Sequence, residues 1–337
     1  MTAPRRVLVL GAQFGGCDRA AEAIAEALLH AGAGCLSVET ADFFRRFSPR
    51  LSSLAALAHR TDAAFLPDGG MSLLELTRST PDSPAVRELS SGAVAALESV
   101  VTMLEPAAVI STHQVAGAAA AELRSRHDFV TATVVCDLLP GRLWAHPGTD
   151  LYFVAGEEVR ERASLHGVEW DRIAVTGVPC RSSFLEGRPR ARTGTRVGVA
   201  LVAPGERPAV RKDLLRAIEE AGADPKDASD GDPGPVVRLC DLAVCAGGGE
   251  LLWSAPAAGV PLVLLGEAPA AERSGADLLV AAGAALPARD TEQLASLVAF
   301  LARRPDRLAA LRNAARSLGR PQAARAVAER VVASVRG

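Results

Sequence analysis

Short apolar runs alternate along the chain with longer amphipathic stretches that are rich in alanine. The apolar runs end at glycine or polar residues and are typical of strands buried on both faces. They predict strands at Arg6–Gly11, Cys35–Glu39, Ala107–Ser111, Phe129–Cys136, Leu151–Val154, Ile173–Val175, Arg196–Val202, Leu242–Cys245, Pro261–Leu265 and Ala284–Leu286. Helices are predicted at Asp18–Gly32, Ser90–Leu104, Ala116–Arg126, Glu157–His166, Val210–Ala221, Glu250–Ala258, Ala271–Ala282 and from Thr291 onward. This alternation predicts an α/β protein with parallel sheets that helices cover on both faces.

A polar stretch near the middle of the chain, Glu186–Gly194, is rich in Arg, Gly and Pro and reads as an interdomain linker. It divides the sequence into a first domain over residues 1–185 and a second over residues 195–320. Residues 321–337 form a terminal helix that we expect to pack back on the first domain. The segment Ala223–Pro235 is polar and has no periodicity, so we expect a loop there and a shortened second domain.

Composition narrows the class of protein. The chain has 337 residues, of which 49% are hydrophobic and 23% charged, as in a globular protein with ample core. A net charge of −2 argues against a nucleic-acid partner, which usually meets a basic face. The six cysteines form no CxxC pair, which indicates free thiols in a reducing cytoplasm and no metal site. Glycine, proline or charge interrupts every long apolar run, so no transmembrane helix is expected.

Two glycine turns follow predicted strands. Gly15 and Gly16 lie between the first strand and a helix that begins near Cys17 and Asp18, at the sheet edge where open parallel sheets bind ligands. Gly248 and Gly249 lie in the same way before the helix that starts at Glu250. Glycine lets the backbone approach a ligand, and unpaired N–H groups at a helix start favour a phosphate. A plain tight turn remains the alternative interpretation of both.

The segment Phe43–Phe47 alternates aromatic and arginine side chains. One interpretation is a helical excursion packed on the N-terminal sheet. The other is a peripheral contact with a membrane or a hydrophobic acceptor, because aromatic and arginine side chains suit that interface.

Several motifs in the first domain resemble those of family 28 of the GT-B glycosyltransferases. The motifs are Thr112-His113 after an apolar strand, Cys136-Asp137, Trp144-Ala145-His146-Pro147, Asp150-Leu151-Tyr152-Phe153-Val154, and the run Val175–Phe184 that reads VTGVPCRSSF. The family includes monogalactosyl- and glucosyl-diacylglycerol synthases and lipid II-forming transferases. The resemblance implies two Rossmann-like domains that face each other across a cleft. It also implies a UDP-sugar donor on the second domain, a lipid or other hydrophobic acceptor on the first, inversion at the sugar carbon, and no metal or further cofactor.

On the acceptor side, the resemblance makes Asp137 the best catalytic candidate and places His113 and His146 near it. Cys17 stands where the family has an acceptor-activating histidine. Its ordinary pKa of about 8.5 suits that task poorly, and the neighbouring Asp18 is the alternative.

On the donor side, Gly248 and Gly249 match the family loop, and Ser254 stands where the family has a ribose-binding glutamate. Glu272 matches a second family glutamate. Without a bound donor, Glu250 and Glu272 are expected to be solvated. These departures leave two functions open. One is an active transferase at the inner face of the plasma membrane, and the other is a catalytically degenerate homologue that acts as a binding or scaffold partner.

Overall fold

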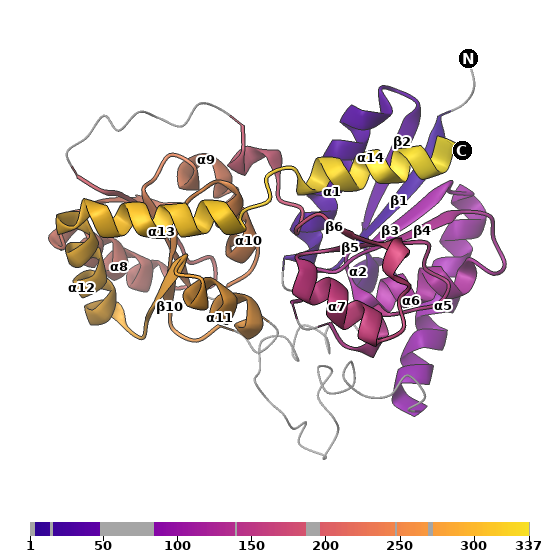
Figure 1. The fold of residues 1–337 in the computed structure, drawn as a ribbon, viewed down its shortest axis with the longest axis horizontal. Helices are drawn as coiled ribbons and strands as arrows, with labels where there is room; N and C mark the ends of the chain where they lie inside the picture. Colours follow the sequence, from indigo (N-terminus) through magenta and orange to yellow (C-terminus); the bar gives the residue numbers. More distant parts are fainter. Residues whose placement is uncertain are drawn as a thin grey trace. The chain divides into compact units, whose positions relative to one another are not determined.

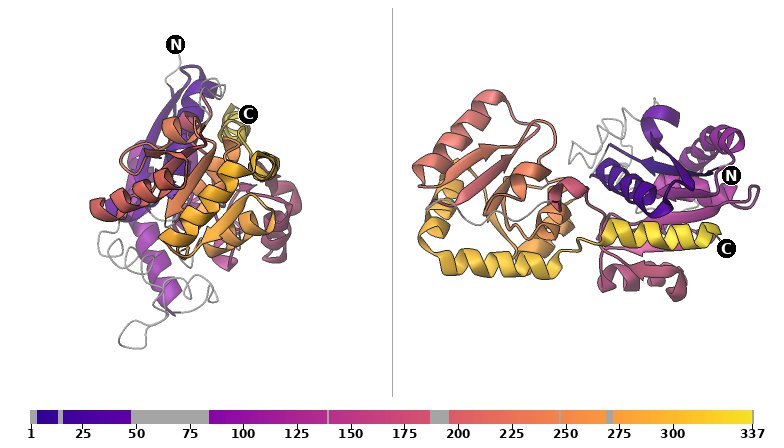
Figure 2. Two further views of the ribbon diagram at one scale, coloured as in Figure 1. Left: turned by 90° about the vertical axis from the view of Figure 1, so that its left-hand side faces the viewer. Right: turned by 90° about the horizontal axis from the view of Figure 1, so that it is seen from above.

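A computed structural model describes residues 4–13, 16–47, 84–138, 140–186, 196–246, 248–268 and 272–336, with the side chains of 47 and 84–90 excepted. The chain forms two compact units (Figures 1 and 2). The first unit contains Met1–Pro179 and Gln322–Gly337, and the second contains Cys180–Pro321.

A parallel sheet forms the centre of the first unit, with the strand order β2-β1-β3-β4-β5-β6 over the described residues. Its strands are β1 (Arg5–Gly11), β2 (Leu36–Asp42), β3 (Ala108–Ser111), β4 (Val130–Val134), β5 (Leu151–Val154) and β6 (Ile173–Val175). Its helices are α1 (Cys17–Gly32), α2 (Phe43–Phe47), α5 (Pro84–Leu104), α6 (Gln114–Leu123), α7 (Glu157–Leu165) and α14 (Ala323–Arg336), with short 3₁₀ turns η1 (Arg142–Trp144) and η2 (Trp170–Arg172).

Strand β1 is buried on both faces, as its continuous apolar sequence predicts. Leu8 and Leu10 pack in one core with α5 and α6, whereas Val7 and Val9 pack in another with α1 and α14. Helix α14 comes from the far end of the chain and lies beside α1 (Figures 1 and 2), where Val331 is fully buried. The first unit is therefore a three-layer α/β sandwich that needs the C-terminal helix to complete one layer.

The second unit repeats this architecture, with the strand order β11-β10-β9-β7-β8 over its described residues, all parallel. The strands are β7 (Gly198–Val202), β8 (Asp224–Asp227), β9 (Leu242–Ala246), β10 (Leu262–Leu265) and β11 (Ala285–Ala288). The helices are α8 (Pro208–Glu220), α9 (Gly234–Val237), α10 (Leu251–Ala257), α11 (Arg273–Ala281), α12 (Thr291–Arg303) and α13 (Pro305–Leu318), preceded by the 3₁₀ turn η3 (Ser182–Phe184).

The prediction of a structureless loop at Ala223–Pro235 is wrong. The segment contains β8 and the start of α9. Within the described residues, β8 is an edge strand whose backbone pairs with β7, through bonds that include Asp224 N to Val197 O at 2.8 Å. An edge strand leaves its side chains in water and tolerates proline, so the polar sequence with Pro225 gave no strand signal.

Two further expectations differ from the structure. Cys180–Leu185 belongs to the second unit, because Phe184 packs in that unit's core, although the sequence division placed it in the first. Phe43 and Phe44 are 0% and 1% exposed in the core that includes Leu8 and Leu10, which agrees with a helix packed on the sheet and not with the alternative of a membrane contact. The side chain of Phe47 lies outside the described residues. Among the described helices, none combines the length and apolar character that crossing a bilayer requires.

Candidate active site

The carboxyl edge of the first sheet gathers five of the residues singled out in the sequence from three strand ends. Cys17 and Asp18 begin α1 after β1, His113 follows β3, and Cys136 and Asp137 follow β4. Gly16, with φ of 73°, turns the chain into α1, whereas Gly15 lies outside the described residues. Gly11 lets α1 approach β1 closely, because a Cβ there would meet the Asp18 Cα at 3.1 Å. The parallel topology thus brings most of the predicted catalytic residues to one edge.

Thr112 ties these strand ends together. Its fully buried hydroxyl donates to the Cys17 carbonyl at 2.7 Å, and its backbone N–H donates to the Leu10 carbonyl at 3.0 Å. The residue thereby fixes the start of α1 against β3. The sequence does not predict this role, because nothing in it shows which carbonyl a threonine will reach.

Replacing Thr112 with valine is expected to lower the free energy of unfolding by about 1 kcal/mol. Valine keeps the shape but removes the buried hydrogen bond to Cys17. Urea unfolding measures the change, and Thr102→Val on the exposed side of α5 is the control. Equal stability of the two variants would contradict this role of the Thr112 hydroxyl.

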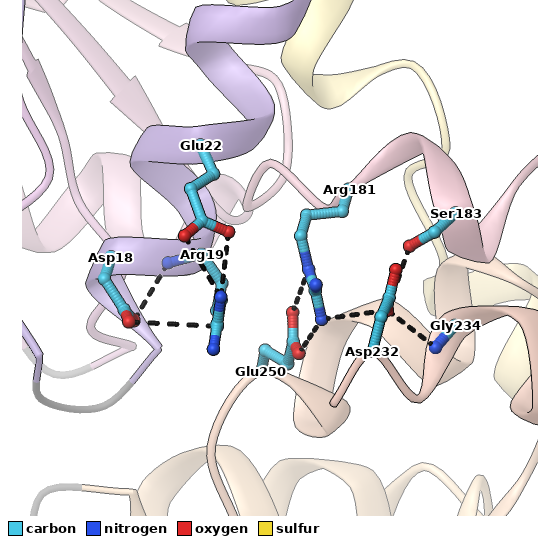
Figure 3. A network of polar contacts seen from close by, with 8 residues as sticks. All are labelled: Asp18, Arg19, Glu22, Arg181, Ser183, Asp232, Gly234 and Glu250. Carbon is cyan, nitrogen blue, oxygen red and sulfur yellow. Dashed lines mark hydrogen bonds and ion pairs between the residues drawn. The ribbon is translucent and has the colours of Figure 1, made fainter. Parts of the chain in front are cut away.

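Cys17 is buried and shares a hydrogen bond with the Cys136 thiol. That bond, burial and the nearby charges of Asp18 and Asp137 raise the pKa of Cys17 well above its usual value. The thiol is therefore neutral at physiological pH and does not act as the base. Burial also raises the pKa of Asp18, against the opposing effect of Arg19. Asp18 accepts the Arg19 backbone N–H at 2.9 Å, and Arg19 pairs with Glu22 (Figure 3).

His113 is the N-cap of α6. Its Nδ1 accepts the backbone N–H of Val115 at 3.3 Å, and its backbone exchanges two hydrogen bonds with the Ser111 hydroxyl. The ring packs edge-on against Phe44, with 4.9 Å between centroids. His113 is therefore held at the same edge as Asp137 by its cap, its strand and a core phenylalanine.

The expectation that His146 lies near Asp137 is wrong. His146 precedes β5, and the nearby Gly148 lies against Ala121 in the last turn of α6, at the amino edge of the sheet. The neighbouring Gly148 accepts the Thr131 hydroxyl at the start of β4, and a Cβ on Gly148 would overlap the carbonyl of Ala121. The backbone N–H of His146 donates to the Tyr152 hydroxyl, and that hydroxyl donates to the His146 carbonyl. Burial lowers the pKa of the His146 imidazole. These contacts make His146 a structural residue of this corner.

In the second unit, the glycine turn follows β9 as predicted, with φ of 81° at Gly248 and 77° at Gly249. Its anion-binding position is already engaged, because the Gly249 N–H donates to the carboxylate of Glu272. Glu272 is only 8% exposed, so the expectation of a solvated carboxylate is wrong. A Cβ on Gly248 would overlap that carboxylate.

Alanine at Gly248 is expected to destabilise the second unit by about 1–2 kcal/mol more than alanine at Gly249. Both positions have a left-handed backbone that disfavours alanine. Only at Gly248 does the new methyl meet Glu272, whereas at Gly249 it meets open space. Urea unfolding of the two variants side by side isolates the Glu272 contact, and equal losses would contradict it.

An ion-pair network lies beside this turn (Figure 3). Arg181 donates from Nε to Glu250 Oε2 at 3.1 Å, contacts Glu250 again through Nη2, and lies 3.1 Å from Asp232 Oδ1. Glu250 is therefore paired, not solvated. Asp232 also accepts hydrogen bonds from Gly234 N and the Ser183 hydroxyl. This network is not predictable from the sequence, because Asp232 lies in a polar segment with no other signal.

Ser254, expected at the ribose, is 0% exposed on α10. Its burial leaves no surface for a ligand in this structure, so its role as a ribose ligand is not supported. No group of three or more His, Cys, Asp or Glu side chains in the described ranges is arranged to hold a metal ion.

Most of the first unit matches a known protein family. The family model of monogalactosyldiacylglycerol (MGDG) synthase matches residues 18–180. The processive diacylglycerol beta-glucosyltransferase of Bacillus subtilis (strain 168) is 25% identical over 208 residues, which cover 51% of this chain and 54% of that protein. The corresponding protein of Bacillus mycoides (strain KBAB4) is 22% identical over 70% of each chain. The match to the B. subtilis relative thus spans about half of its length.

Solved structures extend the likeness to the whole chain. MurG of Acinetobacter baumannii has a TM-score of 0.63 at 16% identity, covering 98% of this chain and all of that one. The calicheamicin glycosyltransferase CalG4 has a TM-score of 0.62 at 15% identity over the full length of both. At these identities the likeness establishes the fold. Residues 18–180 thus match the MGDG synthase family model, within a chain that resembles the family 28 glycosyltransferases and has the GT-B fold.

Proposed function

We propose that this chain transfers a sugar from a nucleotide-diphosphate sugar, a UDP-sugar, to a hydroxyl of diacylglycerol or a similar lipid. The observation that carries the proposal is the meeting of Asp18, His113 and Asp137 at one sheet edge, inside the segment that matches the MGDG synthase family. The diacylglycerol beta-glucosyltransferases among its relatives support a lipid acceptor.

In the proposed reaction, the acceptor oxygen attacks the anomeric carbon of the sugar from the face opposite the nucleotide. The bond from carbon to acceptor oxygen forms as the bond from carbon to phosphate oxygen breaks, so the configuration inverts. The phosphate leaves with the bonding electron pair, and the hydroxyl proton passes to a carboxylate. We assign that base to Asp137, with Asp18 as the alternative, because Cys17 is held as a neutral thiol.

On the donor side, we propose that the backbone of Gly248 and Gly249 faces the diphosphate, with Glu250 and Glu272 nearby. N–H groups at such a turn can stabilise a leaving phosphate without a metal ion. Because Glu272 already accepts the Gly249 N–H, a phosphate that uses this donor must displace the Glu272 carboxylate. The lipid acceptor would place the reaction at a membrane surface, for which we propose the inner face of the plasma membrane.

A thermal shift assay tests nucleotide binding first. UDP at about a hundredfold excess over its Kd is expected to stabilise the chain by roughly 2.7 kcal/mol, and GDP and TDP serve as comparisons. Transfer is then measured with UDP-glucose, UDP-galactose and UDP-N-acetylglucosamine on vesicles that contain diacylglycerol. Absence of a shift with every nucleotide at millimolar concentration would contradict the proposal.

A further inference from the structure

The cap of α6 fixes where His113 carries its proton. The Val115 N–H points at Nδ1 from 3.3 Å, so Nδ1 must offer a lone pair. A neutral imidazole has one protonated and one unprotonated nitrogen, and the proton is therefore on Nε2. With the other tautomer, two N–H groups would face each other at the cap.

The ring is also prevented from exchanging its two nitrogens. Phe44, itself 1% exposed, packs edge-on against it with an interplanar angle of 85°. Ser111 anchors the backbone on both sides of the peptide, accepting the His113 N–H at 3.1 Å and donating to the His113 carbonyl at 2.7 Å. Turning the ring over would break the cap of α6 and disturb the packing of Phe44.

We propose that His113 serves the transfer reaction as a hydrogen-bond donor through Nε2–H, and not as the base that removes the hydroxyl proton. The group that it binds is an oxygen of the lipid acceptor. This inference rests on the proposed function. It assigns different roles to His113 and Asp137. His113 orients the acceptor oxygen, whose proton passes to Asp137 as the bond to the sugar forms.

Two substitutions separate the two nitrogens of the ring. In His113→Asn, a carbonyl oxygen near the Nδ1 position can still cap α6, but nothing replaces Nε2–H. In His113→Gln, an amide N–H lies near the Nε2 position and can donate, but it cannot act as a base, and the cap is weakened. Both variants lose the ring contact with Phe44, so their melting temperatures are compared with each other. We expect the Asn variant, which keeps the cap, to melt about 2–4 °C above the Gln variant and to lose about 100-fold in turnover, whereas the Gln variant keeps most of its turnover.

Turnover is measured with the UDP-sugars on diacylglycerol vesicles, and His127→Asn on the same unit is the control. Imidazole ¹⁵N–¹H correlation spectra of the free wild-type chain report the tautomer directly. A proton on Nδ1, or a Gln variant as inactive as the Asn variant, would overturn the proposal. A wild type that transfers no sugar would contradict the proposed function and with it the donor role. The spectra would still decide the tautomer without any turnover.

Discussion

Replacing Asp137 with asparagine is expected to lower sugar transfer by about 10²–10⁴-fold and to leave the fold intact. A general base contributes this much to a proton transfer, and asparagine keeps the shape of the side chain without its basicity. Asp137 follows β4 at the carboxyl edge that also holds His113 and Cys17. Initial rates on diacylglycerol vesicles measure the loss, while thermal unfolding with and without UDP shows that stability and donor binding persist.

Two other aspartates serve as comparisons for Asp137. Asp128→Asn removes a carboxylate that is fully exposed on the same unit and should leave transfer unchanged. Asp18→Asn tests the alternative base, whose pKa is raised by burial. Full activity of Asp137→Asn together with loss in Asp18→Asn would move the base to the start of α1.

The predicted strands include the edge strands β2, β6 and β11, and the sequence signal is clearest in strands with apolar side chains on both faces. β1, β3 and β9 are continuous apolar runs because they lie inside their sheets, between other strands. β8 has no such signal. It is held by backbone hydrogen bonds to β7, and its side chains Asp224, Lys226 and Asp227 lie at an edge where burial does not select apolar residues.

Parallel topology predicts which residues of the first unit reach the candidate site. Residues that directly follow a strand lie at the carboxyl edge of the sheet, and this rule places His113 and Asp137 at the same edge. His146 precedes a strand, so the same rule assigns it to the opposite edge, and motif resemblance obscured this difference. The sequence left Phe43 between a packed helix and a membrane contact, and its burial in the core after β2 favours the packed helix.

Contacts of high sequence separation were not predictable. Arg181 and Glu250 are separated by 69 positions and Gly249 and Glu272 by 23, and no periodic pattern connects them. Both pairs involve carboxylates that would be solvated as isolated side chains. Their burial depends on the folded unit, and it alters what the glycine turn can offer to a donor.

Arg181→Met is expected to lower the stability of the second unit by about 3–5 kcal/mol. Arg181 and Glu250 are 13% and 12% exposed, and removal of the cation leaves the Glu250 carboxylate with little access to water beside the Asp232 carboxylate, which is 39% exposed. Breaking one partner of a buried ion pair typically costs this much. Urea unfolding measures the loss, and Arg216→Met, whose side chain is 67% exposed, should change stability by less than about 0.5 kcal/mol.

The double variant Arg181→Met, Glu250→Leu separates the energy of the ion pair from the cost of a Glu250 carboxylate that has lost Arg181. If the loss arises from this change at Glu250, replacing both partners with apolar side chains should recover most of it. The Asp232 carboxylate would keep its hydrogen bonds from Gly234 and Ser183. No recovery would mean that Arg181 stabilises the unit mainly through packing, such as its contact with the Phe184 ring at 5.8 Å, and not through its charge.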